Sequence, residues 1–415
     1  MSIDLGRARS LIIGAAFAGC ALRLLFGAVY WVDKPLTHDE REYLALARSV
    51  AAGEGFVYEA SHQTGTAPQF GRAPVYPLFL AMIGAGSLRA EATPLPVKVA
   101  QSFAGGVAVW LLGLIALRAA GPAAGAIAAV LSALYPPLVW MPAYVLSETL
   151  YSVLALGTVL LLDVAMDHTE QVGSGRAGGA LVLIAGMLGG LAVLTRPSML
   201  FFLPLAAMWL VARRRTVLAV TLIAAVLAVL APWTARNVRT YGRFVLVASE
   251  GGVTFWTGNH PLSRGEGDLA ANPDLKRAEV AFRAARPGLT AEELESHYYR
   301  DALDHIADRP WWWLGLVVRK AFYTVVPIGP SYTLHSTRYL AATLVSYLLL
   351  LPFGVAGLGP LVRSPHRPTA LLLLAGSAVL VCLVFFPQER FRIPVIDPTL
   401  IVCASALLAR RLQPA

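Results

Sequence analysis

Two adjacent acidic residues, Asp39 and Glu40, follow directly on the first apolar segment of the chain. Thr37 and Glu40 have the spacing of a capping box, which predicts a helix that begins at about Thr37. A carboxylate fixed there, where the chain leaves a membrane, could take a proton from a hydroxyl group as a general base. Acids in a first turn also simply complement the helix dipole, so these residues alone leave both interpretations open.

Arginines that could bind a phosphate group stand beside or close to prolines in several distant segments. Arg72 lies in an R-A-P sequence, Arg196 in T-R-P, and Arg390 and Arg392 in E-R-F-R-I-P. Guanidinium groups bind phosphate bidentately, so these four are the candidates for holding a donor phosphate. Each arginine taken singly could equally contact a lipid headgroup. Arg23, inside the first apolar segment, could contact a lipid phosphate or snorkel to the interface.

Other polar and aromatic residues in or near the same segments are candidates for contacting a substrate. These candidates are Tyr43, Tyr76, Glu148, Arg236, Asn237, Asn259 and Glu389. No residues are assigned to a metal site, because the three cysteines all lie in apolar segments and no Cys/His cluster has zinc spacing.

The composition places these residues in a membrane protein. The chain has 415 residues, of which 57% are hydrophobic and only 14% are charged, whereas soluble proteins carry about 25% charged residues. The apolar stretches are about 20 residues long, the length that crosses a membrane as a helix. Strand-like alternation is absent, which argues against a barrel. The net charge of +9 comes mostly from short loops, so the positive-inside rule explains it better than nucleic-acid binding.

We therefore predict an all-α polytopic protein with about ten transmembrane helices and both termini in the cytoplasm. Polar glycine-containing sequence at Gly251 to His260 predicts a tight turn, and Thr290 with Glu293 forms a second capping box. The expected regions are a transmembrane module at 1–234, whose first external loop at 33–73 carries the active site, an external region at 235–310, and a C-terminal part at 311–415 with three transmembrane helices. Segment 74–88 is expected to be half-inserted or interfacial, and 311–328 to be an interfacial helix.

In this topology the acids and arginines from widely separated segments share the external face. Most of them lie at helix ends rather than inside loops. A carboxylate beside several guanidinium groups is the set that a reaction at a phosphate requires. This convergence favours the catalytic interpretation of Asp39 over the purely structural one.

The ordered series of motifs resembles the GT-C superfamily of membrane glycosyltransferases, closest to bacterial members of the protein O-mannosyltransferase and aminoarabinose-transferase group. The acidic pair after the first membrane helix is followed by R-x-P-x-Y-P and by T-R-P. The remaining matches are S-E at Ser147-Glu148, P-W-T-A-R-N at 232–237, G-G-V-T-F-W-T-G-N at 251–259 and E-R-F-R-I-P-V at 389–395.

The resemblance implies an inverting hexosyl- or pentosyltransferase that uses a polyprenyl-phosphate-linked sugar donor. The acceptor would be a glycan, lipid or protein of the cell envelope, reached at the periplasmic face of a bacterial inner membrane. The first-loop Asp of the family acts as base or its close partner, which carries over to Asp39, and Glu40 matches the second acid. No cofactor is certain, and a divalent metal is left open because members of the superfamily differ.

Two other functions remain open from the sequence, a secondary transporter and a lipid-sugar flippase of envelope polysaccharide assembly. Transporters often show internal repeats and charges at the bilayer midplane. Here no convincing repeat is found, and the charges gather at one face. The acidic pair argues against a flippase that has the shape without the chemistry.

Overall fold

A computed structural model describes residues 3–57, 71–87, 91–171, 175–266, 269–326 and 337–412. Within these ranges the regular elements are helices, and the one β-type pairing is an isolated bridge between Pro35 and Ala92. The prediction of an all-α protein is confirmed.

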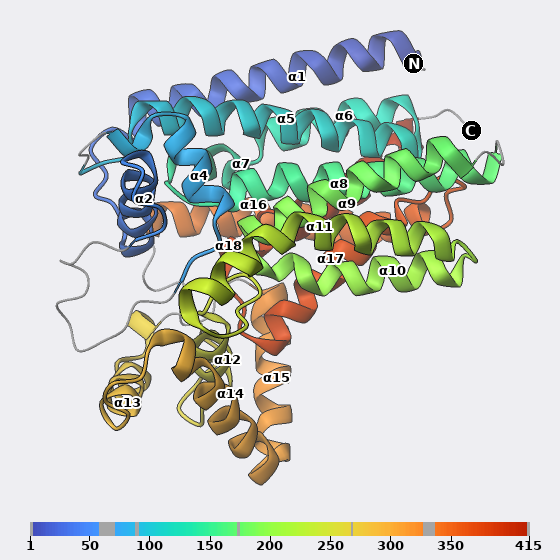
Figure 1. Ribbon diagram of the computed structural model, residues 1–415. Helices are drawn as coiled ribbons and strands as arrows, with labels where there is room; N and C mark the ends of the chain where they lie inside the picture. Colours follow the sequence, from blue (N-terminus) through green and yellow to red (C-terminus); the bar gives the residue numbers. More distant parts are fainter. Residues whose placement is uncertain are drawn as a thin grey trace.

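Long apolar helices run side by side and form a bundle (Figure 1). Six of the described helices are long and apolar enough to cross a membrane, and a bent pair would make a seventh. The six are α1 (Leu5–Leu25, continued by the π-helix Phe26–Tyr30), α5 (Leu95–Ala120), α8 (Glu148–Gln171), α9 (Gly175–Thr195), α11 (Thr216–Tyr241) and α16 (Thr337–Val362); the bent pair is α6 (Pro122–Leu134) with α7 (Pro136–Trp140) and the 3₁₀ turn Met141–Ala143.

Three further segments lie in the same bundle but are shorter. They are η4 with α10 (Pro197–Phe201 and Phe202–Ala212), α17 (Thr369–Val384) and α19 (Ile396–Leu412). The chain is thus a multi-pass membrane protein, whereas the number of about ten crossings remains a prediction. Helix α1 begins and α19 ends at the same end of the bundle (Figure 1), as an even number of crossings would require.

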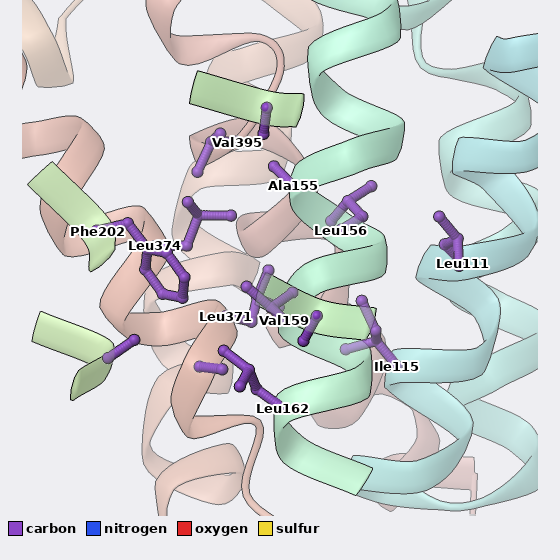
Figure 2. Packing of buried hydrophobic residues seen from close by; sticks show 14 of the residues in the cluster. Leu111, Ile115, Ala155, Leu156, Val159, Leu162, Phe202, Leu371, Leu374 and Val395 are labelled. Atoms are coloured by element: carbon purple, nitrogen blue, oxygen red, sulfur yellow. The ribbon is translucent and has the colours of Figure 1, made fainter. Parts of the chain in front are cut away.

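Helix α8 lies in the middle of the bundle and packs against α5, α9 and α17. Figure 2 shows Leu156 and Val159 of α8 between Ile115 of α5 and Leu371 of α17. Because lipid tails are as apolar as leucine, such helices associate through close side-chain packing rather than through burial from water. This core fixes the helix ends, and through them the residues that those ends carry.

Short helices cover the other end of the bundle, opposite the two termini (Figure 1). Helix α2 (His38–Ala51) packs Tyr43 and Leu44 against Tyr76 and Leu80 of α4 (Val75–Met82). The capping box predicted at Thr37 is present and starts α2. The described part of segment 74–88 thus holds α4, a helix of two turns packed on α2, and the 3₁₀ turn Ala85–Ser87, and both are too short to cross a membrane.

Helices α12 (Gly251–Asn259), α13 (Pro273–Ala284) and α14 (Ala291–Asp308) form a small cluster with its own apolar core around Trp256 and Tyr298. The capping box predicted at Thr290 is present at the start of α14. The tight turn predicted at Gly251 to His260 is wrong, because the segment is helical. A Cβ on Gly252 would lie 2.5 Å from the Glu295 carbonyl oxygen, so glycine serves close packing of α12 on α14.

One helix extends past a region boundary expected from the sequence, and another runs in a different direction from the bundle. Helix α11 continues past Pro232 to Tyr241 and so extends beyond the boundary expected at residue 234. Helix α15 (Pro310–Val325) runs across the direction of the bundle (Figure 1), the orientation of a helix that lies along a membrane surface. Its interfacial position remains a prediction.

Candidate active site

Asp39 lies in the first turn of α2, at the junction between the bundle and the layer of short helices. Its carboxylate accepts a hydrogen bond from Arg72 Nη2 at 2.9 Å and another from Arg390 Nη1 at 2.8 Å. The two arginines lie far from each other in the sequence, and about a quarter of the Asp39 side chain is exposed. The structure therefore brings together the carboxylate and the two guanidinium groups on which the sequence hypothesis depends.

Arg72 stands just before α4 and contacts three carboxylates. Besides Asp39, its Nη2 lies 2.6 Å from Glu42 Oε2 and its Nη1 lies 2.9 Å from Glu250 Oε2. The guanidinium also lies over the ring of Tyr43, 5.4 Å from its centre. Arg72 thus links α2 to Glu250, the residue just before α12.

Arg390, in the short helix α18 (Glu389–Arg392), continues the network into the bundle. Its Nε lies 3.1 Å from Glu148 Oε1, and Arg196 Nη1 lies 2.6 Å from the same oxygen. Glu148 begins α8 and is 1% exposed, so its charge is balanced by the two arginines rather than by water. Six segments that are distant in sequence meet in one network of four carboxylates and three guanidinium groups.

The charges in this network act on one another's pKa values. Burial disfavours the charged form of Asp39, but Arg72 and Arg390 outweigh it and hold the pKa of Asp39 well below its usual range. Burial, together with the nearby Glu42 and Asp39, raises the pKa of Glu250 despite Arg72. The lowered pKa favours the ionised form of Asp39, and the raised pKa lets Glu250 hold a proton more readily than a free glutamate does.

Glu40, the second acid of the predicted pair, is turned away from the arginines. Its Oε2 accepts from the Thr37 amide and its Oε1 accepts from the Val145 amide, both at 2.8 Å. The side chain is buried, with 2% exposed. It closes the capping box of α2 and joins α2 to the segment before α8, which positions Asp39 without presenting a carboxylate to a substrate.

Arg392 also lies outside the network, although it is two residues from Arg390. It is buried against Asp397, with its Nε 2.8 Å from Asp397 Oδ1, and lies 3.8 Å from the ring centre of Tyr347. Arg23 is likewise buried, and donates to carbonyl oxygens of Gly19, Ser132 and Ala133. Both arginines face protein groups in the bundle instead of a surface where a phosphate could reach them.

Three of the candidate substrate residues hold the backbone together. The Asn237 amide donates to the carbonyls of Val245 and Val247. Asn259 donates to Val384 O, and its Oδ1 accepts from Trp313 Nε1 and Lys320 Nζ. Arg236 donates to Phe56 O at 3.4 Å, and its guanidinium lies 5.0 Å from the ring centre of Trp233 and 5.4 Å from that of Tyr241.

The other candidates lie at the site. Tyr43 and Tyr76 meet edge to face with ring centres 4.9 Å apart, next to Arg72. Glu389 is half-buried and directly precedes Arg390 in α18. Tyr76 is fully buried, so it packs beneath the network rather than opening onto it.

Sequence reasoning missed two acids of the network, Glu42 and Glu250. Glu42 stands three residues after Asp39, and this spacing places both on one face of a helix, so its position was readable from the pattern. Glu250 comes from a segment with no such relation to Asp39. Long-range contacts bring it to Arg72, among them the hydrogen bonds between Ser249 and Gly71.

The described residues do not fit a metal centre. No three His, Cys, Asp or Glu side chains are arranged to hold an ion in that part of the chain. The carboxylates around Asp39 face guanidinium groups, which occupy the positions that a cation would need.

Comparison with known proteins identifies solved structures with a similar fold. No family model matches the sequence, and no curated protein matches it either. Among solved structures, the oligosaccharyltransferase of Archaeoglobus fulgidus in complex with Zn and sulfate superimposes with a TM-score of 0.55 and 16% identity, over 96% of this chain and 49% of that one. A second structure of that enzyme, AglB, with an inhibitory peptide and a dolichol-phosphate, gives 0.53 and 16%, over 96% and 50%.

ArnT from Cupriavidus metallidurans, bound to undecaprenyl phosphate, gives a TM-score of 0.44 with 15% identity, over 97% of this chain and 77% of that one. The chain spans about half the length of the oligosaccharyltransferase that it resembles. The likeness to the oligosaccharyltransferase extends over nearly the whole of this chain and confirms the fold that the motifs predicted.

Proposed function

We propose that this protein is an inverting glycosyltransferase that moves a sugar from a polyprenyl-phosphate donor to an acceptor of the cell envelope. The observation that carries the proposal is the Asp39 carboxylate, held by Arg72 and Arg390 where the bundle meets the layer of short helices. A base and two phosphate-binding cations at the end of membrane helices suit a donor whose leaving group is a lipid phosphate.

In the proposed reaction Asp39 accepts the proton of the acceptor hydroxyl group. The hydroxyl oxygen forms a bond to the anomeric carbon as the bond from that carbon to the phosphate oxygen breaks. The electron pair leaves with the lipid phosphate, and attack from the opposite side inverts the anomeric configuration. Holding the acceptor beside the base also accelerates the reaction by orienting the hydroxyl group, in addition to the effect of proton transfer.

Arg390 and Arg72 have two tasks in this scheme. In the free protein they face carboxylates, which keeps the pKa of Asp39 low and makes it a weak base. A donor phosphate that takes hydrogen bonds from the same guanidinium groups draws them away from Asp39, and the pKa of Asp39 then rises. Donor binding would thus both place the leaving group and strengthen the base.

Arg196 holds Glu148 at the inner side of the network and supports Arg390 through that shared carboxylate. Arg196 is therefore assigned to positioning rather than to direct phosphate contact. Arg392 and Glu40 are given no contact with substrate, because both are buried against protein groups.

The similarity to AglB supports this proposal through the fold and through the ligand that one of its structures contains, a dolichol-phosphate. We place the site on the periplasmic side of a bacterial inner membrane, with both termini cytoplasmic, and we propose a hexose or pentose as the transferred sugar. No step of the mechanism passes through a metal ion.

The test is release of free polyprenyl phosphate by purified protein. Synthetic decaprenyl-phosphate hexose and pentose donors are offered with a cell-envelope extract as acceptor. We expect release with at least one donor, and Asp39→Asn should lower its rate by about 10²- to 10⁴-fold, the usual contribution of a general base. Asp274→Asn, at an exposed acid in α13, is the matched control and should leave the rate unchanged.

Near-normal release by Asp39→Asn would refute the role of this carboxylate. Failure of the wild-type protein to cleave any donor, together with movement of a labelled lipid-linked sugar across a vesicle membrane, would indicate a flippase instead.

A further inference from the structure

A polar cavity lies at the other end of the bundle from Asp39. Its volume is about 510 Å³, within the range of cavities that hold small ligands. Helix α8 runs from the network to this cavity, from Glu148 to Glu170, which is about 33 Å at 1.5 Å per residue. Residues of five helices and of the turns after α10 and α16 line it, among them Arg118, Asp167, Trp209, Arg213, Arg363 and Arg367.

Two of the four arginines in this cavity are neutralised by carboxylates. Arg118 Nη2 lies 2.7 Å from Asp167 Oδ2, and Arg213 pairs with Glu170. The third acid, Asp163, accepts a hydrogen bond from the Ala370 amide at 3.1 Å. The acids of the cavity therefore already have partners.

The other two arginines, Arg363 and Arg367, are exposed. Neither side chain makes a hydrogen bond or an ion pair with any residue that the structure describes. The cavity thus presents two uncompensated guanidinium groups, four residues apart, at the turn between α16 and α17. An anion with several oxygen atoms could accept hydrogen bonds from both.

The cavity lies where candidate membrane spans end. Arg118, Glu170 and Val362 stand in the last turns of α5, α8 and α16, and all three contribute to the lining. Trp209 adds an aromatic ring of the kind that is enriched at the level of lipid headgroups. Val362 and Met166 supply apolar wall beside the charges, which suits a molecule with a polar head and an apolar tail.

We propose that this cavity binds the phosphate-bearing headgroup of an anionic membrane lipid, with Arg363 and Arg367 as its ligands. The site is separate from the network around Asp39 and does not depend on the transferase function. A headgroup held there would join the ends of α8, α10, α16 and α17, so that lipid binding would stabilise the bundle.

The test measures lipid bound to the purified, delipidated full-length protein by native mass spectrometry. Phosphatidylglycerol is the probe, and phosphatidylcholine serves as the zwitterionic comparison. We expect phosphatidylglycerol to bind more tightly than phosphatidylcholine, and Arg363→Gln with Arg367→Gln to weaken it roughly thirtyfold, since each such arginine contributes about a factor of five near an anionic surface. Arg277→Gln in α13 is the matched control and should bind as the wild type does.

Lysine at both positions keeps the charge and should restore most of the affinity, which separates loss of charge from damage to the fold. Three results would overturn the proposal. They are equal binding of the two lipids by the wild type, undiminished phosphatidylglycerol binding by the double glutamine variant, and complete displacement of the lipid by millimolar inorganic phosphate. The last would assign the cavity to a soluble phosphate.

Discussion

At the scale of single residues, the site depends on how one arginine is shared between two acids. Arg390 Nη1 donates a hydrogen bond to Asp39, and Arg390 Nε lies beside the carboxylate of Glu148. Glu148 is almost fully buried, so Arg390 cannot leave it without a large loss of electrostatic stabilisation. Its contact with the partly exposed Asp39 is the one that a ligand could replace.

Replacing Arg390 by Gln should therefore change the pH dependence of the reaction as well as its rate. Asp39 would keep only Arg72, and its pKa would rise from its lowered value toward or above the ordinary value of about 4. The ionised base is present above its pKa, so the acid limb of the kcat/KM profile should move to higher pH. The pH dependence of donor cleavage, measured in parallel for Arg277→Gln, checks this.

The lowered pKa of Asp39 also makes the stability of the fold depend on pH. Because the pKa of Asp39 is lowered on folding, its ion pairs stabilise the protein above about pH 4 and lose that effect as the pH falls toward the lowered pKa.

In the Arg390→Gln protein, an acid limb of the kcat/KM profile that stays in place while the rate falls would mean that Arg390 acts on the phosphate and leaves the base unaffected.

The sequence predicted part of this arrangement. Proline-flanked Arg72 and the first-turn Asp39 were recognisable by residue type and position, and the structure places them in contact. The choice between Arg390 and Arg392 was not recognisable, because residues two apart on a helix point to different sides. Which side faces the acids depends on how α18 packs, and that is a property of the whole bundle.

At the scale of elements, short sequence patterns predicted where helices begin better than they predicted whether a glycine-containing segment is a turn or a helix. Both capping boxes were correct, because the interaction joins residues only three apart. The glycines at 251 and 252 predicted a turn but form part of α12. Their role is to let α14 approach closely, a long-range requirement that leaves no local signature distinct from that of a turn.

Helix α15 has two different faces. Trp311, Leu314, Val318, Phe322 and Val325 recur at helical spacing and are exposed, Trp311 by 83% and Val318 by 69%. On the other side the fully buried Lys320 donates to Asn259 Oδ1 at 3.0 Å and to Leu383 O at 3.2 Å. Lys320 thus fixes α15 to α12 and α17 and turns the apolar face outward.

This face should lie in the membrane interface. A cysteine introduced at Val318 and labelled with an environment-sensitive fluorophore should emit at shorter wavelength in vesicles than a label at Asp304, the matched exposed position in α14. Cys20→Ser provides the background, since Cys382 and Cys403 are buried. Equal emission from the two labels would place α15 in water.

At the scale of the whole molecule, the network around Asp39 requires the short helices and the bundle to meet in one arrangement. Glu250 is held beside Arg72 by two hydrogen bonds between the neighbouring residues Ser249 and Gly71. The packing of α12 onto the end of α17 is a second constraint on its position. Asn259 donates to Val384 O at 2.9 Å, and Gly258 lies so close to Phe385 that a Cβ would overlap its carbonyl oxygen. A contact at the opposite end of α12 therefore contributes to the position of Glu250.

Gly258→Ala should accordingly disturb both stability and activity, although the residue touches none of the charged groups. The added methyl group must push α12 away from α17, and overpacking of this kind costs about 1–3 kcal/mol. Gly315→Ala in α15, where a Cβ would meet nothing within 4 Å, is the control and should be neutral or stabilising by up to about 1 kcal/mol.

Thermal unfolding in detergent and donor cleavage at a temperature where both variants are folded measure the two effects. If α12 acts through Glu250, the double variant Gly258→Ala, Glu250→Gln should raise the activation free energy of donor cleavage by less than the sum of the increases in the two single variants. The reason is that a Glu250 displaced by Gly258→Ala has already lost its contact with Arg72. Full additivity, or a Gly258→Ala protein that behaves like Gly315→Ala, would show that the approach of α12 to α17 does not set the geometry at Arg72. A coupled result would mean that the separation between helix layers controls the charge balance around Asp39.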